Sequence, residues 1–532
     1  HKHRRPPMEY KDLLGGKGAN LAEMTSVLEL PVPPGFTISL DLCRRYLEER
    51  RLPAGFREAL REGVGFLEQA AGARFGDARR PLLVSARSGA AVSMPGMLDT
   101  VLNLGLNEES VQGLMRKSGN PRFAWDSFRR LVAMFGEVVC AVPRLEFERL
   151  LEEAKQEAGV EVDYELDART LRGLTRGSLS LFERRTGRPF PMDPYDQLSE
   201  AIIAVFDSWN SERAQEYRRI HEIEGLEGTA VTVQSMVFGN SGADSGTGVA
   251  FTRDPVTGKN VLYLDFLFNA QGEDIVAGIR TPQAGEDLVR ELPEVSSQLE
   301  EIRLRLEQVF TEMQDIEFTV EEGKLFLLQT RTGKRSPLAA LRIAIDQVEE
   351  GMISKGEALD RLAGFDPAVL RTVRIEGDPG VDPIGTAIPA CSGVAAGRIA
   401  LSSARAREFS GAGSPIILVR EDTSADDISG MAVSAGILTA RGGRTSHAAV
   451  VARQMGIPCL VGCRDLRIDL PTRTAELRGS GLREGEPVTL DANSGRVYPG
   501  DRVPLSTSEP EELGVIREWI RQEGASDHPL AR

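Results

Sequence analysis

Apolar residues recur at helical spacing through much of the first part of the chain, between glycine-rich turns. Residues 15–30 begin with a glycine turn and continue as a helix, with Leu21 and Leu28 on one face. Residues 80–89 combine an apolar run with a polar end, which is typical of a short buried strand that leads into a turn. From about residue 108 to residue 210 the helical period dominates. We therefore expect a helical subdomain over 108–210.

Strand-like patterns return in the second part of the chain. Residues 229–238 read as a strand, and residues 245–268 read as two strands joined by a turn that contains Asp-Pro and Thr-Gly. Residues 315–333 predict a hairpin that turns at Glu-Glu-Gly. Further on, short apolar runs surround a predicted helix at 446–456, and a last hairpin is expected over 486–500. The pattern predicts sheets and helices in both parts of the chain.

The length and the punctuation of the chain predict several domains. A single core stops growing at roughly 250 to 300 residues, and this chain has 532. Glycine and proline residues cluster at 376–389, which indicates a boundary. We expect a multidomain protein of α/β and α+β class. The predicted division is a first domain over 1–336, a helical linker over 337–375, a smaller domain over 376–504 and a tail over 505–532.

Composition excludes several classes of protein. The net charge is −15, and no apolar run approaches the roughly 18 residues that a membrane span needs. The acidic balance disfavours nucleic acid as a partner, whereas small anions need only local basic pockets. The five cysteines are scattered, and no apolar signal segment opens the chain. We expect a cytoplasmic protein that binds no membrane, and we expect Cys459 and Cys463 to be buried free thiols.

Residues 442–462, GGRTSHAAVVARQMGIPCLVG, contain one of only five histidines in the chain. Thr445 and Ser446 can cap the helix that follows, and His447 then lies in its first turn. Unpaired N–H groups and the helix dipole stabilise an anion at this point. His447 is therefore a candidate phosphoryl acceptor, with a histidine packed at a helix end as the open alternative. Its expected surroundings are Arg441, Gly442, Gly443, Thr445 and Ser446, with further charge available from Arg444 and Arg453.

The predicted hairpin at 315–331 is a candidate metal site. Strand alternation puts Asp315 and Glu317 on one face, and Gln329 and Arg331 share a face on the returning strand. Carboxylates with an amide oxygen suit Mg²⁺, which usually also keeps waters and substrate phosphate oxygens. We expect Asp315, Glu317 and Gln329 as metal ligands. A solvated strand face is the alternative.

Residues 436–463, GILTARGGRTSHAAVVARQMGIPCLVGC, closely resemble the phosphohistidine segment of the phosphoenolpyruvate-utilising enzymes. Residues 419–431 are similar to the acidic approach segment of that domain. In the family, the histidine at this place carries the phosphoryl group. The resemblance implies this role for His447, within a swivelling β/β/α phosphohistidine domain.

Segments along the rest of the chain resemble the nucleotide-binding domain of the pyruvate phosphate dikinase family, in the same order. They include LLGGKGANLAEM at 13–24, SARSGAAVSMPGMLDTVLNLGLN at 85–107 and FNAQGEDIVAGIRTPQ at 268–283. The resemblance implies an ATP-grasp-type domain that binds ATP with Mg²⁺. It assigns triphosphate contacts to Lys17, Arg87 and Arg130, metal and phosphate contacts to Glu317, Gln329 and Arg331, and the border of the adenine to Gln234, Met236 and Val237.

The same resemblance implies a reaction. His447 would attack the β-phosphorus of Mg-ATP and release AMP, and inorganic phosphate would then remove the terminal phosphoryl group as pyrophosphate. In the family, the group left on the histidine passes to pyruvate in a C-terminal barrel, which forms phosphoenolpyruvate (PEP). A barrel of this kind needs ~250 residues, and the chain ends at Arg532. We expect pyruvate and PEP to be served by a barrel that is absent here or separate.

Some residues depart from the dikinase pattern and leave alternatives open. Asp265 and Ala425 differ from the expected residues, and Arg444 is similar to phosphoenolpyruvate synthase, a relative that uses water as the second acceptor. The alternatives are that water-using reaction, a two-domain phosphocarrier with another acceptor, and a nucleotide-binding relic without catalysis. A homodimer is also left open. Thr445 matches a regulatory threonine of plant dikinases, where a phosphoryl dianion would repel the donor.

Overall fold

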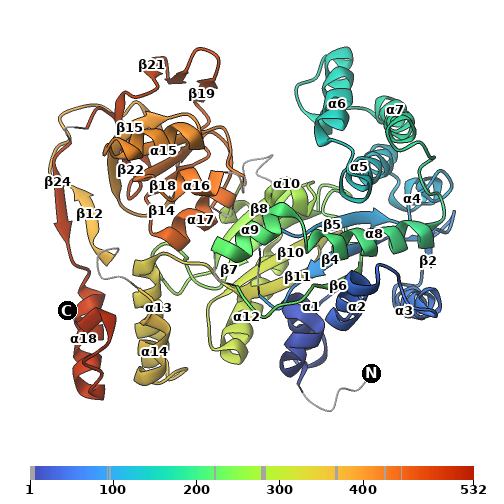
Figure 1. Cartoon of the computed structure of the whole chain (residues 1–532), viewed down its shortest axis with the longest axis horizontal. Helices are drawn as coiled ribbons and strands as arrows, with labels where there is room; N and C mark the ends of the chain where they lie inside the picture. Colours follow the sequence, from blue (N-terminus) through green and yellow to red (C-terminus); the bar gives the residue numbers. More distant parts are fainter. Residues whose placement is uncertain are drawn as a thin grey trace. The chain divides into compact units, whose positions relative to one another are not determined.

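The computed structural model describes residues 6–92, 94, 97–220, 223–276, 283–365, 370–424, 427–444, 446–501 and 503–531. The chain divides into two compact units. The first contains His1–Gly242 and Phe326–Gln329, and the second contains Ala243–Leu325 and Thr330–Arg532. Figure 1 colours the chain from blue at the N-terminus to red at the C-terminus. Each unit has sheets and apolar cores of its own.

A four-stranded antiparallel sheet organises the first unit, with strand order β1-β6-β4-β5. Its central strand β6 is buried along its whole length, which explains the apolar run in the sequence. Strand β1 was not predicted, because its four residues directly follow a proline-rich stretch and give a short signal. The strands are β1 (Gly35–Ile38), β4 (Val84–Gly89), β5 (Thr100–Leu104) and β6 (Ala230–Ser235), with helices α1 (Lys11–Ser26), α2 (Leu40–Glu49) and α3 (Phe56–Ala71).

Helices fill the described residues between β5 and β6. Asparagine or aspartate caps three of them: Asn120, Asp167 and Asp193 each accept a hydrogen bond from a backbone N–H in the first turn. Edge-to-face phenylalanine contacts pack this region: the ring centroid of Phe182 lies 5.4 Å from that of Phe190, in the segment that follows the helix of Phe182. The helices are α4 (Ser110–Ser118), α5 (Pro121–Cys140), α6 (Arg144–Ala158), α7 (Ala168–Thr186), α8 (Pro194–Ser208) and α9 (Glu212–Ile220).

A five-stranded sheet of order β11-β10-β7-β8-β9 opens the second unit. Two glycines in β7 leave room for aromatic rings: a Cβ on Gly248 would lie 2.3 Å from the ring of Phe318, and one on Gly246 would lie 2.2 Å from Phe266. The predicted hairpin is present, with its turn at Glu322 and Gly323, both at positive φ. The strands are β7 (Gly246–Phe251), β8 (Tyr263–Phe268), β9 (Gln283–Ala284), β10 (Gln314–Glu321) and β11 (Lys324–Thr332).

An eight-stranded mixed sheet forms the later part of the second unit, with order β13-β23-β22-β15-β16-β17-β18-β14. Successive residues of β16 pack on opposite faces: Ile416 and Leu418 share a core with helix α17, and Ile417 and Val419 join the core on the other face. The parallel strands are β15 (Val394–Ala400), β16 (Ile416–Arg420), β17 (Gly436–Thr439) and β18 (Cys459–Val461). The others are β13 (Gly385–Thr386), β14 (Ile388–Cys391), β22 (Pro487–Asp491) and β23 (Arg496–Pro499), with helices α15 (Ser403–Gly411), α16 (Ile428–Met431) and α17 (His447–Met455).

The predicted linker and the predicted tail pack together. Strand β12 (Thr372–Ile375) pairs antiparallel with β24 (Leu505–Ser508). Helix α18 (Glu511–Glu523) shares an apolar core with α13 (Pro337–Glu349) and α14 (Lys355–Leu362). These segments are distant in sequence, and their pairing was not predicted.

The structure also bears on the predictions from composition. All five cysteines are free thiols; Cys459 and Cys463 are buried as predicted, and Cys140 is half-buried. Among the described residues, no helix combines the length and the apolar character that a membrane crossing requires.

Candidate functional site

His447 is the first residue of helix α17, and the loop before the helix fixes its position. Ser446 is the N-cap, and its side chain accepts a hydrogen bond from Ala449 N at 3.5 Å. Gly442 has φ +96°, and a Cβ there would lie 2.9 Å from Ser446 Cβ. Both glycines, Gly442 and Gly443, are buried. The sequence prediction of a capped helix with His447 in its first turn is confirmed, while Thr445 lies outside the described residues.

The imidazole of His447 is held by a hydroxyl from another element. Thr423 Oγ1 lies 3.1 Å from His447 Nδ1. If the proton is on Nδ1, this nitrogen donates to the hydroxyl oxygen and the lone pair of Nε2 is free. Nε2 is then the nucleophilic atom. The loop that carries Thr423 follows β16, which is the neighbour of β17 in the sheet.

The surroundings of His447 favour its neutral form. Burial lowers the pKa of His447 below its ordinary value, and the charge of Asp427 opposes part of this effect. Asp427 is itself buried. Its carboxylate accepts hydrogen bonds from Ser403 Oγ at 2.6 Å and Ser424 N at 3.1 Å, so it also fixes the loop that holds Thr423.

Two arginines of the predicted surroundings have different positions. Arg453 is 1% exposed, and its Nη1 donates to the carbonyl oxygen of Arg444 at 2.7 Å. The side chain of Arg441 is exposed, but its backbone N–H donates to Glu421 O at 2.8 Å. Both contacts hold the loop between β17 and α17. Arg453 therefore supports the loop and does not offer its charge to solvent.

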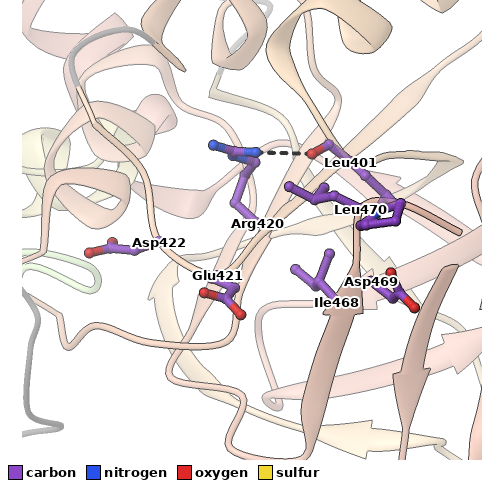
Figure 2. Close-up of a pocket in the computed structure, with 8 residues that line it drawn as sticks. Leu401, Arg420, Glu421, Asp422, Ile468, Asp469 and Leu470 are labelled. Atoms are coloured by element: carbon purple, nitrogen blue, oxygen red, sulfur yellow. Dashed lines mark hydrogen bonds between the residues drawn. The ribbon is translucent and has the colours of Figure 1, made fainter. Parts of the chain in front are cut away.

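A cavity of about 380 Å³ lies beside the segment that leads to Thr423. Figure 2 shows Arg420 Nη1 bonded to Leu401 O, while Asp422 points away from Ile468 and Asp469. The charged residues of the lining are Glu421, Asp422 and Asp469 with one cation, Arg420, so carboxylates outnumber basic groups. Such a lining repels a triphosphate, so we do not assign ATP to it.

In the first unit, Lys17 lies beside Gly89 of β4, the strand that carries Arg87. Helix α1 is kinked at Gly15, where φ is +70°, and Gly16 N donates to Ala90 O at 2.9 Å. A Cβ on Gly89 would lie 3.4 Å from Lys17 Cβ. Arg87 is two residues earlier on the same strand, and therefore on the same face as residue 89. Arg87 Nη1 donates to Leu328 O at 3.4 Å.

Arg130 has carboxylate partners within the helical region. Its Nε donates to Asp126 Oδ2 at 2.9 Å, and its Nη2 donates to Asp163 Oδ2 at 3.3 Å. Asp126 also accepts from Arg129. Although burial opposes it, the combined charge of the arginines holds the pKa of Asp126 well below its usual range. Arg130 thus belongs to a buried ionic network.

The residues predicted to border the adenine lie on β6 and just beyond it. Gln234 is buried, and its Nε2 donates to Pro33 O at 3.1 Å. Met236 N donates to Leu83 O at 2.9 Å. Met236 and Val237 are half-buried and follow the last residue of the strand, Ser235.

In the second unit, Arg331 lies against both predicted carboxylates. Its Nε donates to Asp315 Oδ2 at 2.8 Å, and its Nη2 is 4.0 Å from Glu317 Oε1. Burial raises the pKa of Asp315, and the charge of Arg331 opposes this effect. Gln329 is buried and is assigned to the first unit.

The residues on β10 fit a Mg²⁺ ion that is completed by phosphate oxygens. Asp315 Oδ1 is buried and has no hydrogen-bond partner among the described residues. A buried carboxylate oxygen without a partner is costly, and a hard cation would satisfy it. No group of three or more His, Cys, Asp or Glu residues with metal-binding geometry occurs in the described parts of the chain. On this strand, Asp315 and Glu317 offer two carboxylates to Mg²⁺, and oxygens of the substrate would complete its coordination.

Sequence reasoning missed the roles of Thr423 and Asp427. Both lie in the segment that resembles the acidic approach of the phosphohistidine domain, but only that segment as a whole was recognised. A signal was present, because a threonine and an aspartate four residues apart can close a loop through side-chain to backbone bonds. The contact between Thr423 and His447 links residues 24 positions apart, and the spacing alone does not reveal it.

Comparison with known families agrees with this geometry. Residues 413–495 match the family described as "PEP-utilising enzyme, mobile domain", which places this part of the chain in the class of PEP-utilising enzymes. Residues 11–65, 53–287 and 292–352 match "Pyruvate phosphate dikinase, AMP/ATP-binding domain". The chain belongs to the pyruvate phosphate dikinase family, whose members are phosphotransferases.

Individual relatives cover nearly all of this chain. It is 47% identical over 521 residues to "Pyruvate, phosphate dikinase" of Clostridium symbiosum, which covers 96% of the chain and 59% of that protein. It is 49% identical over 530 residues to the enzyme of the same name from Rhizobium meliloti, with 96% and 58% covered. "Pyruvate, phosphate dikinase 2" of Zea mays is 47% identical over 513 residues. The chain spans just under three fifths of the length of these relatives.

Proposed function

We propose that this chain transfers a phosphoryl group from ATP to His447, with AMP and pyrophosphate as products and inorganic phosphate as second acceptor. The geometry around His447 is the main support for this proposal. A histidine whose pKa is lowered by burial lies at the start of a helix, and Thr423 is 3.1 Å from its Nδ1. A neutral imidazole with a fixed ring and a free Nε2 is the required nucleophile.

The proposed reaction takes place in two steps, and each step breaks one bond for the bond that it forms. Nε2 attacks the β-phosphorus of ATP; the N–P bond forms as the bond from this phosphorus to the α,β-bridging oxygen breaks, and AMP leaves with that oxygen. Inorganic phosphate then attacks the terminal phosphorus of the pyrophosphoryl group on His447. The bond from this phosphorus to the bridging oxygen breaks, pyrophosphate leaves, and one phosphoryl group stays on His447. The free N–H groups at the start of α17 stabilise the developing negative charge.

Nucleotide binding is assigned to an ATP-grasp-type domain over 1–336, with its helical subdomain at 108–210. The match of residues 11–352 to the AMP/ATP-binding family supports this assignment. Lys17, which lies beside Gly89 of β4, and Arg87 of the same strand are proposed to bind the triphosphate with Arg130. Gln234, Met236 and Val237 would border the adenine, and Glu317, Gln329 and Arg331 would contact phosphate and metal.

A Mg²⁺ ion at Asp315, Glu317 and Gln329 would neutralise phosphate charge and orient the triphosphate. The unpartnered Asp315 Oδ1 supports this set of ligands. Arg331 already pairs with Asp315, so it would hold the carboxylate in position and add a cation next to the phosphates.

The later fate of the phosphoryl group is proposed from the relatives. The name pyruvate, phosphate dikinase of these relatives supports pyruvate as the acceptor, and transfer to pyruvate would form PEP. This transfer would take place in a barrel domain on the same or another chain, and the phosphohistidine domain, 376–504, would reach it by swivelling on the 337–375 linker. The tail over 505–532 would support that linker. Five free cysteines favour a reducing cytoplasm.

Exchange of radioactive AMP into ATP tests the first step without needing pyruvate. With Mg²⁺, wild-type protein should catalyse this exchange, because AMP can reverse the attack of His447 on the β-phosphorus. His447→Asn should not exchange at all. The matched control is His528→Asn, since His528 bonds to Leu359 O in the C-terminal helical core. Exchange that survives in His447→Asn would refute the proposal.

A further inference from the structure

The proposed reaction leaves unused an arginine beside the carrier histidine. Arg444 lies three residues before His447 in the loop between β17 and α17. Its backbone is anchored, because its carbonyl oxygen accepts a hydrogen bond from the buried Arg453 at 2.7 Å. Three residues span at most about 10 Å of chain. The long side chain of Arg444 can therefore reach the ring of His447.

The guanidinium of Arg444 has a weak set of contacts. Within the second unit, its Cζ lies 4.8 Å from the centre of the Tyr263 ring, at cation–π distance. Burial lowers the pKa of Arg444, and Asp254 contributes a smaller opposing effect. Nε is buried without a hydrogen-bond partner, and Arg444 makes no ion pair with the carboxylates in the described ranges. A partly buried cation without a paired anion is poorly satisfied.

We propose that Arg444 binds the phosphoryl group on His447, and that Tyr263 holds its guanidinium before the group arrives. This inference rests on the proposed function. A phosphoryl dianion offers charge-assisted, bidentate hydrogen bonds, which are stronger than a contact with an aromatic face. The unpartnered Nε belongs to the fork that makes such bonds. Arrival of the phosphoryl group therefore moves Arg444 from Tyr263 to the phosphate oxygens.

The other nearby arginines are less suitable. Arg453 is six residues beyond His447 on the same helix, a rise of roughly 9 Å, and its guanidinium is bonded to the loop carbonyl. The side chain of Arg441 is exposed, where water weakens its attraction for a phosphate. Arg444 combines closeness in the chain, partial burial and a guanidinium that forms no ion pair with any described residue.

The second pKa of the phosphoryl group on His447 tests this inference. A bound cation lowers this pKa, because it favours the dianion. Titration by phosphorus NMR of this chain, phosphorylated with ATP, should give a higher value for Arg444→Met, by on the order of one pKa unit, and an intermediate value for Arg444→Lys. The control Arg464→Met removes the same charge from an exposed site of the same domain and should leave the value unchanged.

The outcomes separate this inference from the proposed function. Tyr263→Leu should also leave the phosphoryl pKa unchanged, because Arg444 has left the ring in the phosphorylated state. If Arg444→Met forms phosphohistidine with the wild-type pKa, then Arg444 does not bind the group and the inference is wrong. If wild-type protein forms no phosphohistidine, the proposed function fails, and this inference fails with it.

Discussion

The hydroxyl of Thr423 contacts Nδ1 of His447 and leaves Nε2 outside this contact. The hydroxyl oxygen lies 3.1 Å from Nδ1, so the tautomer that donates to it leaves Nε2 as the nucleophile. Thr423 is a positioning residue, because it acts through the histidine.

Replacing Thr423 separates this role from simple packing. Thr423→Val keeps the shape but removes the hydroxyl, and we expect AMP–ATP exchange to fall about tenfold or more, with part of the phosphoryl group on Nδ1. Thr423→Ser should restore Nε2 as the sole site. The measurement is phosphorus–nitrogen NMR of protein with labelled histidine. Pure Nε2 phosphorylation at the wild-type rate in Thr423→Val would exclude the positioning role.

The pH dependence of the exchange follows from the burial of His447. Its folded pKa is below its ordinary value of 6.5, so the neutral nucleophile persists to lower pH than for a free histidine. The acid inflection should lie below 6.5, and Asp427→Asn should lower it further, because the Asp427 charge raises this pKa. The same shift means that stability decreases as pH falls through the unfolded pKa near 6.5. An inflection above 6.5 would contradict this environment.

At the scale of elements, the kink in helix α1 places Lys17 against β4. Gly15 has φ +70°, and a Cβ there would lie 1.6 Å from the carbonyl oxygen of Gly89. Backbone cannot move aside as a flexible side chain can. The helix and the strand therefore meet only because residue 15 has no side chain.

Substitutions at Gly15 and Gly55 test how much the contact between residue 15 and Gly89 contributes to stability. Gly55 also has positive φ, but nothing lies within 4 Å of a Cβ placed there. Gly55→Ala should cost about 1–2 kcal/mol from backbone strain alone. Gly15→Ala should lower the free energy of unfolding by several kcal/mol more than Gly55→Ala, and it should also weaken ATP binding. Thermal unfolding measures the first effect, and nucleotide titration measures the second. Equal losses in the two variants would show that the contact with Gly89 is unimportant.

The elements that could be predicted are those whose sequence signals lie within a few residues of one another. The helix at His447 has glycines, a cap and an apolar face within a few residues, and the β10–β11 hairpin has strand alternation around a glycine turn. The contact of Arg130 with Asp163 was not predictable, because Asp163 lies 33 residues away in the chain. Strand β24 was missed for a similar reason, since its partner β12 is a distant and equally short segment.

At the scale of the molecule, the C-terminal helix completes a core that begins with α13. Ile516 is fully buried in this core with Leu341 and Leu359, whereas the neighbouring Val515 is 40% exposed. The predicted linker and tail are therefore one packed element. Any movement of the phosphohistidine domain would start from this support.

Neighbouring substitutions on α18 measure the strength of that support. Ile516→Ala should destabilise the second unit by about 2–5 kcal/mol, because it leaves a cavity in a filled core. Val515→Ala should change stability by less than about 0.5 kcal/mol, as at other surface positions. Calorimetry of both variants is the measurement. Similar unfolding profiles for the two variants would show that α18 does not stabilise the unit.

The central claim is that His447 keeps the β-phosphoryl group of ATP. The most direct measurement follows β-labelled and γ-labelled ATP with Mg²⁺, with and without phosphate, on wild type and His447→Asn. The account predicts that the β-label stays on wild-type protein, that the γ-label leaves as pyrophosphate only when phosphate is present, and that the variant keeps neither label. Release of the γ-label as orthophosphate without added phosphate would make water the second acceptor. No label on His447 under any condition would contradict the account.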